Sequence, residues 1–305
     1  MKRLSDKCSW LQRSTIGITA SICVLVTGIA CGGASTSSHS SDPVVAHVVL
    51  VVEENHSYSD VIGNSAMPYF NSLASQYGLA TEYFANAHPS LPNYLALTTG
   101  QTETFDDNFA GTITDDNVVR ELVKAGKTWK AYVESIPFAG YLGGDTGLYL
   151  RHHVPFTYYS DIQNDTAQAG NIVDFGQFSA DLASDSLPQY SFIVPNIMDD
   201  AHDGTLAQAD SWLQANIAPL LANSAFQASG LLVITFDEGD QADTDHGGGH
   251  VATLIVSPQS KKGFQSTTTY QHPSTLRLTL AASGVDAFPG AAKSAPDMTE
   301  FFLGH

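Results

Sequence analysis

The sequence predicts an α/β protein, a three-layer α/β/α sandwich built on a mostly parallel central sheet. From residue 44 onward, short and continuously apolar segments alternate with segments of helical length. The apolar segments lack the alternation of a half-exposed strand, which indicates strands covered on both faces. No internal repeat or long low-complexity insert interrupts this pattern. Residues 44–305 are therefore predicted to form one domain.

Five segments are predicted strands and five are predicted helices. The strands are expected at residues 46–52, 128–133, 190–194, 231–236 and 251–257. The helices are expected at residues 67–77, 93–99, 117–125, 206–222 and 274–282. Strands that alternate with helices favour parallel connections within one sheet. Because ligands of such sheets bind at the carboxyl ends of the strands, those ends are the places to search for a site.

Two of the predicted strands end in acidic residues. Glu53 and Glu54, followed by Asn55, leave the first strand, and Asp237 and Glu238 leave the fourth. Charges at such positions need a partner if they are buried, and carboxylates that converge need a cation. Taken alone, Glu53 and Glu54 are equally consistent with an exposed turn whose acids are solvated. Two acidic ends in one sheet favour a shared cation site.

Three further segments lie at the ends of predicted elements. Ser90 precedes the helix at 93–99, where free N–H groups and the helix dipole favour an anion, although a simple helix-capping role is the alternative. Segment 195–204 follows the third strand, and segment 245–250 precedes the fifth. Histidines beside acidic strand ends are candidates for acid–base chemistry or for contacts to phosphate. The polar groups that these two segments carry include Asp200, His202, Asp203 and His250.

In this order, the motifs resemble the phosphoesterase family of secreted acid phosphatases and bacterial phospholipases C, within the alkaline-phosphatase-like superfamily. The resemblance covers nearly the whole chain beyond residue 44. The matching motifs are 54–58 (ENHSY), 88–100 (HPSLPNYLALTTG), 129–134 (WKAYVE), 151–156 (RHHVPF), 195–204 (PNIMDDAHDG), 235–238 (TFDE) and 296–299 (PDMT). The resemblance implies an alkaline-phosphatase-like sandwich and a metal-dependent hydrolase of phosphoric esters.

The resemblance also implies roles for individual residues. Glu54, Asn55, Asp237 and Glu238 are the implied metal ligands, and Ser90 is the implied nucleophile that also touches the metal. Oxygen donors of this kind favour one hard cation, Mg²⁺, Ca²⁺ or Mn²⁺, with Fe and Zn left open. A metal lowers the pKa of a serine hydroxyl, so an alkoxide attacks phosphorus. A phosphoserine intermediate on Ser90 is expected.

A second group of residues is expected to bind the phosphate or to move protons. Asn93, one helical turn after Ser90, is expected to contact a phosphate oxygen. The expected histidines are His153, His202 and His250. Asp200 and Asp203 are expected to orient them or to serve as additional ligands, Asp200 in a second metal site.

The sequence gives less support to other functions. The acidic stretch 237–245 lacks the spacing of an EF-hand, and no G-x-S-x-G motif of a serine esterase occurs. A non-catalytic surface-anchored binding protein is the alternative from a different class, and the implied ligands together with Ser90 argue against it. A phosphomonoesterase of the acid phosphatase type is favoured over a phospholipase C-type phosphodiesterase, because the body lacks a long extra C-terminal domain.

The first 43 residues predict export. Basic residues precede an apolar stretch at 16–29, as in a secretory signal peptide over residues 1–30. Cys31 and the Ser/Thr-rich tether at 31–43 resemble a bacterial lipoprotein, whose lipidated cysteine anchors it to a membrane. Ordinary cleavage that releases a secreted protein is the alternative. The expected location is the cell envelope or the exterior.

Composition and charge narrow the partners. Of the 305 residues, 43% are hydrophobic and only 14% are charged, as in a packed globular protein. The formal net charge is −18, and removal of residues 1–30 leaves nine cations against 30 anions, or −21. Such acidity argues against nucleic acid, so a small phosphate ester is the expected partner, with no obligate protein partner. The cysteines Cys8, Cys23 and Cys31 all precede the body, which therefore lacks thiols.

Overall fold

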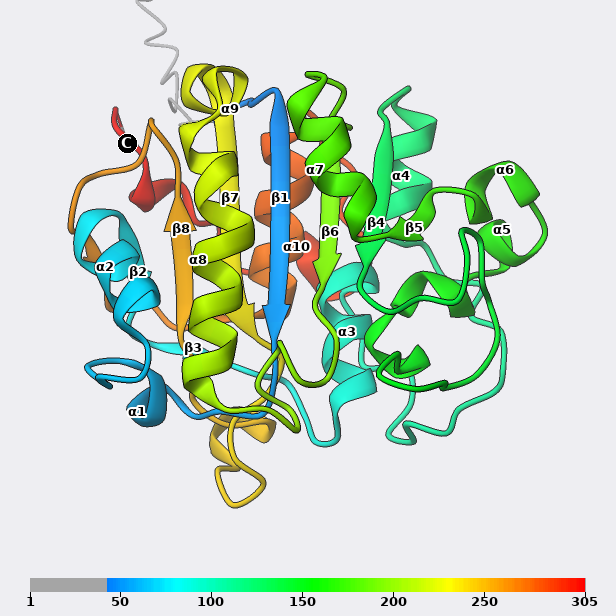
Figure 1. Cartoon of the computed structure of the whole chain (residues 1–305), viewed down its shortest axis with the longest axis horizontal. Coiled ribbons are helices and arrows are strands. Elements are labelled where there is room, and N and C mark those ends of the chain that lie inside the picture. Colours follow the sequence, from blue (N-terminus) through cyan, green and yellow to red (C-terminus); the bar gives the residue numbers. More distant parts are fainter. Residues whose placement is uncertain (1–42, 305) are drawn as a thin grey trace, which may run out of the picture. The chain divides into compact units, whose positions relative to one another are not determined.

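The computed structural model describes residues 43–304, and its main feature is an eight-stranded sheet flanked by helices (Figure 1). The strand order is β5-β4-β6-β1-β7-β8-β2-β9. β8 runs antiparallel to both of its neighbours, and the other pairings are parallel. The predicted fold class, a sandwich on a mostly parallel sheet, is confirmed.

The strands and helices have the following bounds. The strands are β1 (His47–Glu53), β2 (Gly78–Ala80), β3 (Tyr83–Phe84), β4 (Trp129–Val133), β5 (Ile172–Asp174), β6 (Tyr190–Val194), β7 (Gly230–Phe236), β8 (Thr253–Val256), β9 (Gln265–Ser266) and β10 (Tyr270–Gln271). The helices are α1 (Tyr58–Val61), α2 (Pro68–Gln76), α3 (Ser90–Thr99), α4 (Val118–Lys124), α5 (Ser160–Gln163), α6 (Thr166–Ala169), α7 (Gly176–Ala183), α8 (Leu206–Ala222), α9 (Ser224–Ser229) and α10 (His272–Ala282). Short 3₁₀ helices include η1 (Arg151–His153) and η2 (Pro155–Tyr158).

Helices cover both faces of the sheet, which explains why its strands are continuously apolar. In Figure 1, α7 and α8 lie in front of the strands and α10 lies behind them. α10 packs against α3 and α4 on the rear face, and α2 and α9 pack against α8 on the front face. Every residue of β6 and β7 is buried, as are the last six of β1. The core therefore lies on both sides of the sheet.

α3 carries the predicted nucleophile, and all ten of its residues are buried. The helix begins at Ser90, three residues before the predicted start. Pro92 is compatible with that start because N–H groups of a first turn have no partner inside the helix. Gly100 ends the helix in the left-handed conformation, with φ 76°.

The reversed strand β8 changes which residues lie at the functional edge. Because β8 runs opposite to β7, the segment before β8 lies at the same edge as the carboxyl ends of β1, β6 and β7. This explains how the acidic loop at 239–249 reaches the edge to which residues 53–55 belong.

The predictions for the first residues of the chain lie outside the described residues. They are the signal peptide at 1–30, the lipidated Cys31 and most of the tether at 31–43. Among residues 43–304, no helix combines the length and the apolar character needed to cross a membrane.

Candidate active site

Two acidic strand ends lie side by side at the lower edge of the sheet in Figure 1. β1 and β7 are parallel neighbours, and their register pairs Glu53 with Phe236. The next residues along the two strands are therefore adjacent as well. The N–H of Asn55 donates to Asp237 Oδ1 at 3.1 Å, which ties the two ends together. The structure thus brings Glu54, Asn55 and Asp237 into one cluster.

The backbone bends sharply at this cluster. Asn55 has φ 55° and Ala201 has φ 75°, both in the left-handed region that residues other than glycine seldom adopt. Asn55 directly follows Glu54, and Ala201 directly follows Asp200. Unfavourable backbone conformations of this kind are common at functional sites, where the surrounding packing holds them in place.

Ser90 reaches the cluster from the first turn of α3. Its hydroxyl donates to Glu54 Oε2 at 3.2 Å. The N-cap of the helix is Pro89, so Ser90 does not cap α3. One turn later, the Tyr94 hydroxyl donates to the other oxygen, Glu54 Oε1, at 2.5 Å. α3 therefore holds the Glu54 carboxylate by both oxygens.

His153 and Asp200 complete the buried part of the cluster. His153 Nε2 lies 3.2 Å from Glu54 Oε1, and its Nδ1 lies 3.5 Å from Asp200 Oδ2. The His153 ring also stacks on Tyr94, with ring centroids 5.2 Å apart. Burial lowers the pKa of His153 to about 3, and nearby His202 adds to this effect. The imidazole is therefore neutral near neutral pH and can act as a metal ligand or hydrogen-bond donor.

His202 lies at the exposed side of the cluster. Its backbone N–H donates to Asp200 Oδ1 at 2.8 Å, and its Nδ1 lies 2.8 Å from Asp203 Oδ1. The His202 side chain is 31% exposed. It therefore combines access to solvent with a carboxylate that orients its ring, as general acids and bases require.

The carboxylates of the cluster have strongly perturbed acidity. Burial, followed by the charges of Asp237 and Asp200, raises the pKa of Glu54 well above its usual value. Burial also raises the pKa of Asp200 to about 7 and that of Asp237 to about 6. For Glu238, burial and then the charge of Asp237 raise the pKa to about 9. Four buried acids that repel one another provide a strong attraction for a cation.

The donors present fit a divalent metal ion. Asp237 Oδ2, Asp200 Oδ2 and His153 Nε2 are buried and have no hydrogen-bond partner among the described residues. Ligand atoms of Glu54, His153 and His202 lie within 4.8 Å of one another. Two imidazoles beside the carboxylates widen the choice of metal beyond the hard cations that the oxygen donors favour.

Glu238 contacts His88 and Asn93 as well as the charge of Asp237. Glu238 Oε2 lies 3.0 Å from His88 Nδ1 and 3.3 Å from Asn93 Nδ2. The Asn93 side chain also accepts from the N–H groups of Asn86 and Ala87. Asn93 thus holds the loop that leads to Ser90, and its expected contact to phosphate stays a prediction.

His250 lies apart from the other histidines in its contacts. Its Nε2 lies 2.8 Å from the Thr81 carbonyl oxygen, and its ring stacks on Tyr58 and Phe84. Within residues 43–304, no hydrogen bond or ion pair joins it to Ser90 or to the acidic cluster. Its expected role in stabilising phosphate charge or protonating the leaving oxygen stays a prediction.

Two residues of this site, Tyr94 and His88, were not predicted from the sequence. Tyr94 lies four residues after Ser90, and this spacing places two side chains on one face of a helix. The spacing therefore indicated that Tyr94 lies near Ser90. His88 lies in the same motif, but its contact to Glu238 spans 150 residues and has no local signal.

Comparison with known proteins places the chain among phosphate-ester enzymes. The family model described as the Phosphoesterase family matches residues 64–285. A phosphatidylinositol-3-phosphatase of Mycobacterium tuberculosis is 38% identical over 264 residues, which cover 85% of this chain and 84% of the relative. A phosphate-repressible acid phosphatase of Penicillium chrysogenum is 35% identical and covers 70% of this chain. The chain spans 54% of that fungal relative's length.

Solved structures with low sequence identity share the fold. A protein of the alkaline phosphatase superfamily from Vibrio parahaemolyticus has a TM-score of 0.61 at 11% identity, covering 86% of this chain and 74% of its own. A phosphonate monoester hydrolase from Silicibacter pomeroyi has a TM-score of 0.56 at 14% identity, covering 85% and 77%. These likenesses confirm the expected alkaline-phosphatase-like fold.

Proposed function

Since this chain belongs to the phosphoesterase family of phosphate-ester hydrolases, we propose that it is a metal-dependent phosphomonoesterase of the acid phosphatase type. The observation that carries the proposal is the contact of Ser90 with Glu54 inside a cluster of buried acids. A serine at a helix start, directed at a cation site, suits nucleophilic attack on phosphorus.

The expected ligand set would hold the metal. Glu54, Asn55, Asp237 and Glu238 are the proposed ligands, and the group of Glu54, His153 and His202 offers an overlapping alternative. A bound divalent cation supplies charge neutralisation for the phosphate and lowers the pKa of a nearby hydroxyl.

The residues of the chain then divide the reaction between them. Ser90 Oγ passes its proton to the Glu54 carboxylate that it contacts and forms a bond to phosphorus as the bond to the alcohol oxygen breaks. His202, oriented by Asp203, donates a proton to the departing alcohol. Water then gives a proton to His202 as it attacks the phosphoserine, the Oγ–phosphorus bond breaks, Ser90 Oγ regains its proton from Glu54, and phosphate leaves. His153 stays neutral and buried, with its Nε2 3.2 Å from Glu54 Oε1.

Two variants and one chelation series test this proposal. Ser90→Ala should abolish hydrolysis of 4-nitrophenyl phosphate, whereas Ser274→Ala, at a buried serine on α10, should retain it. Removal of metal should abolish turnover, and re-addition of single metals should restore it selectively. Near-normal turnover in folded Ser90→Ala protein, or after verified metal removal, contradicts the proposal. Turnover of 4-nitrophenyl phosphocholine in preference to 4-nitrophenyl phosphate would instead indicate the phosphodiesterase alternative.

Export and lipid anchoring belong to the same proposal. Residues 1–30 are proposed to direct export, and Cys31 to carry the lipid. Metabolic labelling with a fatty acid should mark the wild-type chain and not Cys31→Ser. Equal labelling of both, or labelling of neither, contradicts the anchor.

A further inference from the structure

A cavity of about 300 Å³ lies between residues 107–110, residues 144–151 and Tyr158. Its lining includes Asp107, Phe109, Asp145, Arg151 and Tyr158. The volume falls at the lower end of the range of small-molecule sites, about 300–1,000 Å³. The proposed roles of Ser90 and the metal cluster make no use of these residues.

Two residues that line the cavity, Asp107 and Arg151, are connected to elements of the candidate site. Asp107 Oδ1 accepts from the N–H of Leu91 at 2.9 Å, and Leu91 directly follows Ser90. Arg151 begins η1, and the third residue of η1 is His153, which contacts Glu54. The cavity therefore lies beside both the nucleophile helix and the buried histidine.

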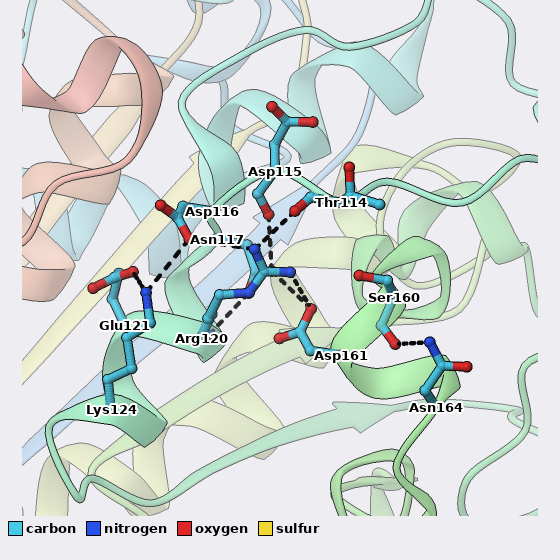
Figure 2. A network of polar contacts seen from close by, with 10 residues as sticks. All are labelled: Thr114, Asp115, Asp116, Asn117, Arg120, Glu121, Lys124, Ser160, Asp161 and Asn164. Carbon is cyan, nitrogen blue, oxygen red and sulfur yellow. Dashed lines mark hydrogen bonds and ion pairs between the residues drawn. The ribbon is translucent and has the colours of Figure 1, made fainter.

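Hydrogen bonds hold the segment that carries Tyr158. Ile113 N–H donates to the Tyr158 carbonyl at 2.8 Å. Figure 2 shows that Arg120 links the same segment to α5, since its guanidinium donates to Thr114 O at 2.8 Å and to Asp161 Oδ1 at 2.9 Å. These contacts hold residues 113–120 against α5 and against the backbone of Tyr158.

The charged groups of the cavity narrow the chemistry of that ligand. Asp107 and Asp145 offer only acceptors when ionised, and the Arg151 guanidinium offers only donors. Asp145 Oδ1 accepts the Arg151 backbone N–H at 2.7 Å, and the Arg151 guanidinium lies 4.2 Å above the Tyr158 ring centre. A cationic ligand is disfavoured, because Arg151 already covers the face of the Tyr158 ring on which a cation would bind. A second phosphate is disfavoured, because Asp107 and Asp145 would repel it. A hydroxyl both donates and accepts, so it suits acceptors and donors together.

We propose that this cavity is the leaving-group subsite and that it selects neutral, polyhydroxylated alcohols, as in sugar or polyol monophosphates. The inference rests on the proposed phosphomonoesterase function. The Arg151 guanidinium donates to Thr157 through Nε and Nη2, and its remaining N–H groups donate to hydroxyl oxygens of the alcohol. Asp145 accepts from the hydroxyl groups of the alcohol. Phe109 and Tyr158 form the apolar wall, with ring centres 5.8 Å apart.

Kinetics with matched substrates test the proposal. Glucose 6-phosphate carries a neutral polyol, phosphocholine a cation, fructose 1,6-bisphosphate a second phosphate, and 4-nitrophenyl phosphate no alcohol hydroxyl. The wild-type enzyme should have its highest kcat/KM among the first three on glucose 6-phosphate. Arg151→Met and Asp145→Asn should each lower kcat/KM for glucose 6-phosphate about tenfold, the loss expected for one hydrogen bond to a charged group. The value for 4-nitrophenyl phosphate should fall less, so that the ratio of the two values falls, because no polyol contact is lost.

Matched controls separate the cavity from general charge effects. Lys262→Met removes another cation that lies over a tyrosine ring, 4.0 Å from the centre of Tyr77, and Asp106→Asn removes the neighbouring exposed carboxylate. Neither should change the ratio of glucose 6-phosphate to 4-nitrophenyl phosphate turnover. Preference for phosphocholine or the bisphosphate, or equal effects of the cavity variants on every substrate, overturns the subsite.

A binding measurement decides the question independently of turnover. Ser90→Ala protein should bind glucose 6-phosphate about tenfold more tightly than inorganic phosphate in calorimetric titrations, and Arg151→Met should remove that difference. Equal affinities of the Ser90→Ala protein for glucose 6-phosphate and inorganic phosphate would overturn the subsite. Absence of turnover on every substrate, together with the predicted binding difference, would contradict the proposed function and leave the subsite supported.

Discussion

Removal of the metal should make the stability of this protein fall steeply as the pH rises. In the metal-free protein, the folded state holds protons on buried acids that the unfolded chain releases. Burial and the charge of Asp237 raise the pKa of Glu238 to about 9, and burial raises that of Asp200 to about 7. Because the folded state binds more protons than the unfolded state, the free energy of unfolding decreases with increasing pH.

The magnitude follows from the number of protons involved. Each proton held only by the folded state changes the free energy of unfolding by about 1.4 kcal/mol per pH unit. The interval from pH 7 to 8.5 lies between the unfolded and folded pKa values of Glu238, so we take the contribution of this one group. The expected loss is about 2 kcal/mol, or roughly 4–8 °C in Tm for a domain of this size. A bound divalent cation should restore the loss, since it replaces the protons.

Thermal unfolding of metal-free and metal-loaded protein across this pH range is the assay. Glu238→Gln should make the metal-free profile less steep, because it removes one of the titrating groups, and Asp106→Asn should leave the slope unchanged. A metal-free Tm that is constant or rises with pH would refute the reasoning. The same conclusion would follow if Glu238→Gln kept the wild-type slope.

Three further changes test single contacts. Tyr94→Phe removes the hydroxyl that holds Glu54 Oε1 and should weaken metal binding about tenfold in titration calorimetry while the fold is kept; unchanged affinity would remove Tyr94 from the site. Burial raises the pKa of Asp181, but hydrogen bonds from its lysine, tyrosine and glutamine partners outweigh that effect, so the pKa lies below its ordinary value of 3.8. Its stabilisation is therefore present above about pH 4 and lost as the pH falls further, so Asp181→Asn should cost about 1–3 kcal/mol at neutral pH in urea unfolding and less in acid. A cost that grows in acid would argue against this sign. Gly248→Ala would place a Cβ 2.4 Å from a backbone oxygen of the loop before the nucleophile, so we expect about 1–3 kcal/mol of destabilisation, and wild-type stability would show that the loop shifts freely.

The long, strongly patterned elements could be predicted from the sequence because local signals coincide with burial. α8 was predicted with its observed bounds, since Thr205 caps its start and Asn223, which caps the next helix, lies just past its end. β6 was also predicted with its observed bounds, because its five apolar or small residues are buried between helices. The two- and three-residue strands β2, β9 and β10 were missed, because their pairing depends on distant partners rather than on their own sequence.

The residues of the candidate site likewise differ in whether a local sequence signal reveals them. Glu54, Asp237 and Ser90 could be found because acids at strand ends and a serine at a helix start are local features. The contact of His88 with Glu238 and the hydrogen bond of His250 to Thr81 depend on how distant loops fold together. The reversed direction of β8 likewise has no signal in its apolar run, which is compatible with either direction.

Trapping of the covalent intermediate tests the central claim most directly. Wild-type protein mixed with 4-nitrophenyl phosphate and quenched in acid should carry one phosphoryl group, and peptide mass spectrometry should locate it on Ser90. The Ser90→Ala protein should carry none. A phosphoryl group on another residue, or continued turnover in Ser90→Ala protein, would contradict a phosphoserine mechanism at the edge of this sheet.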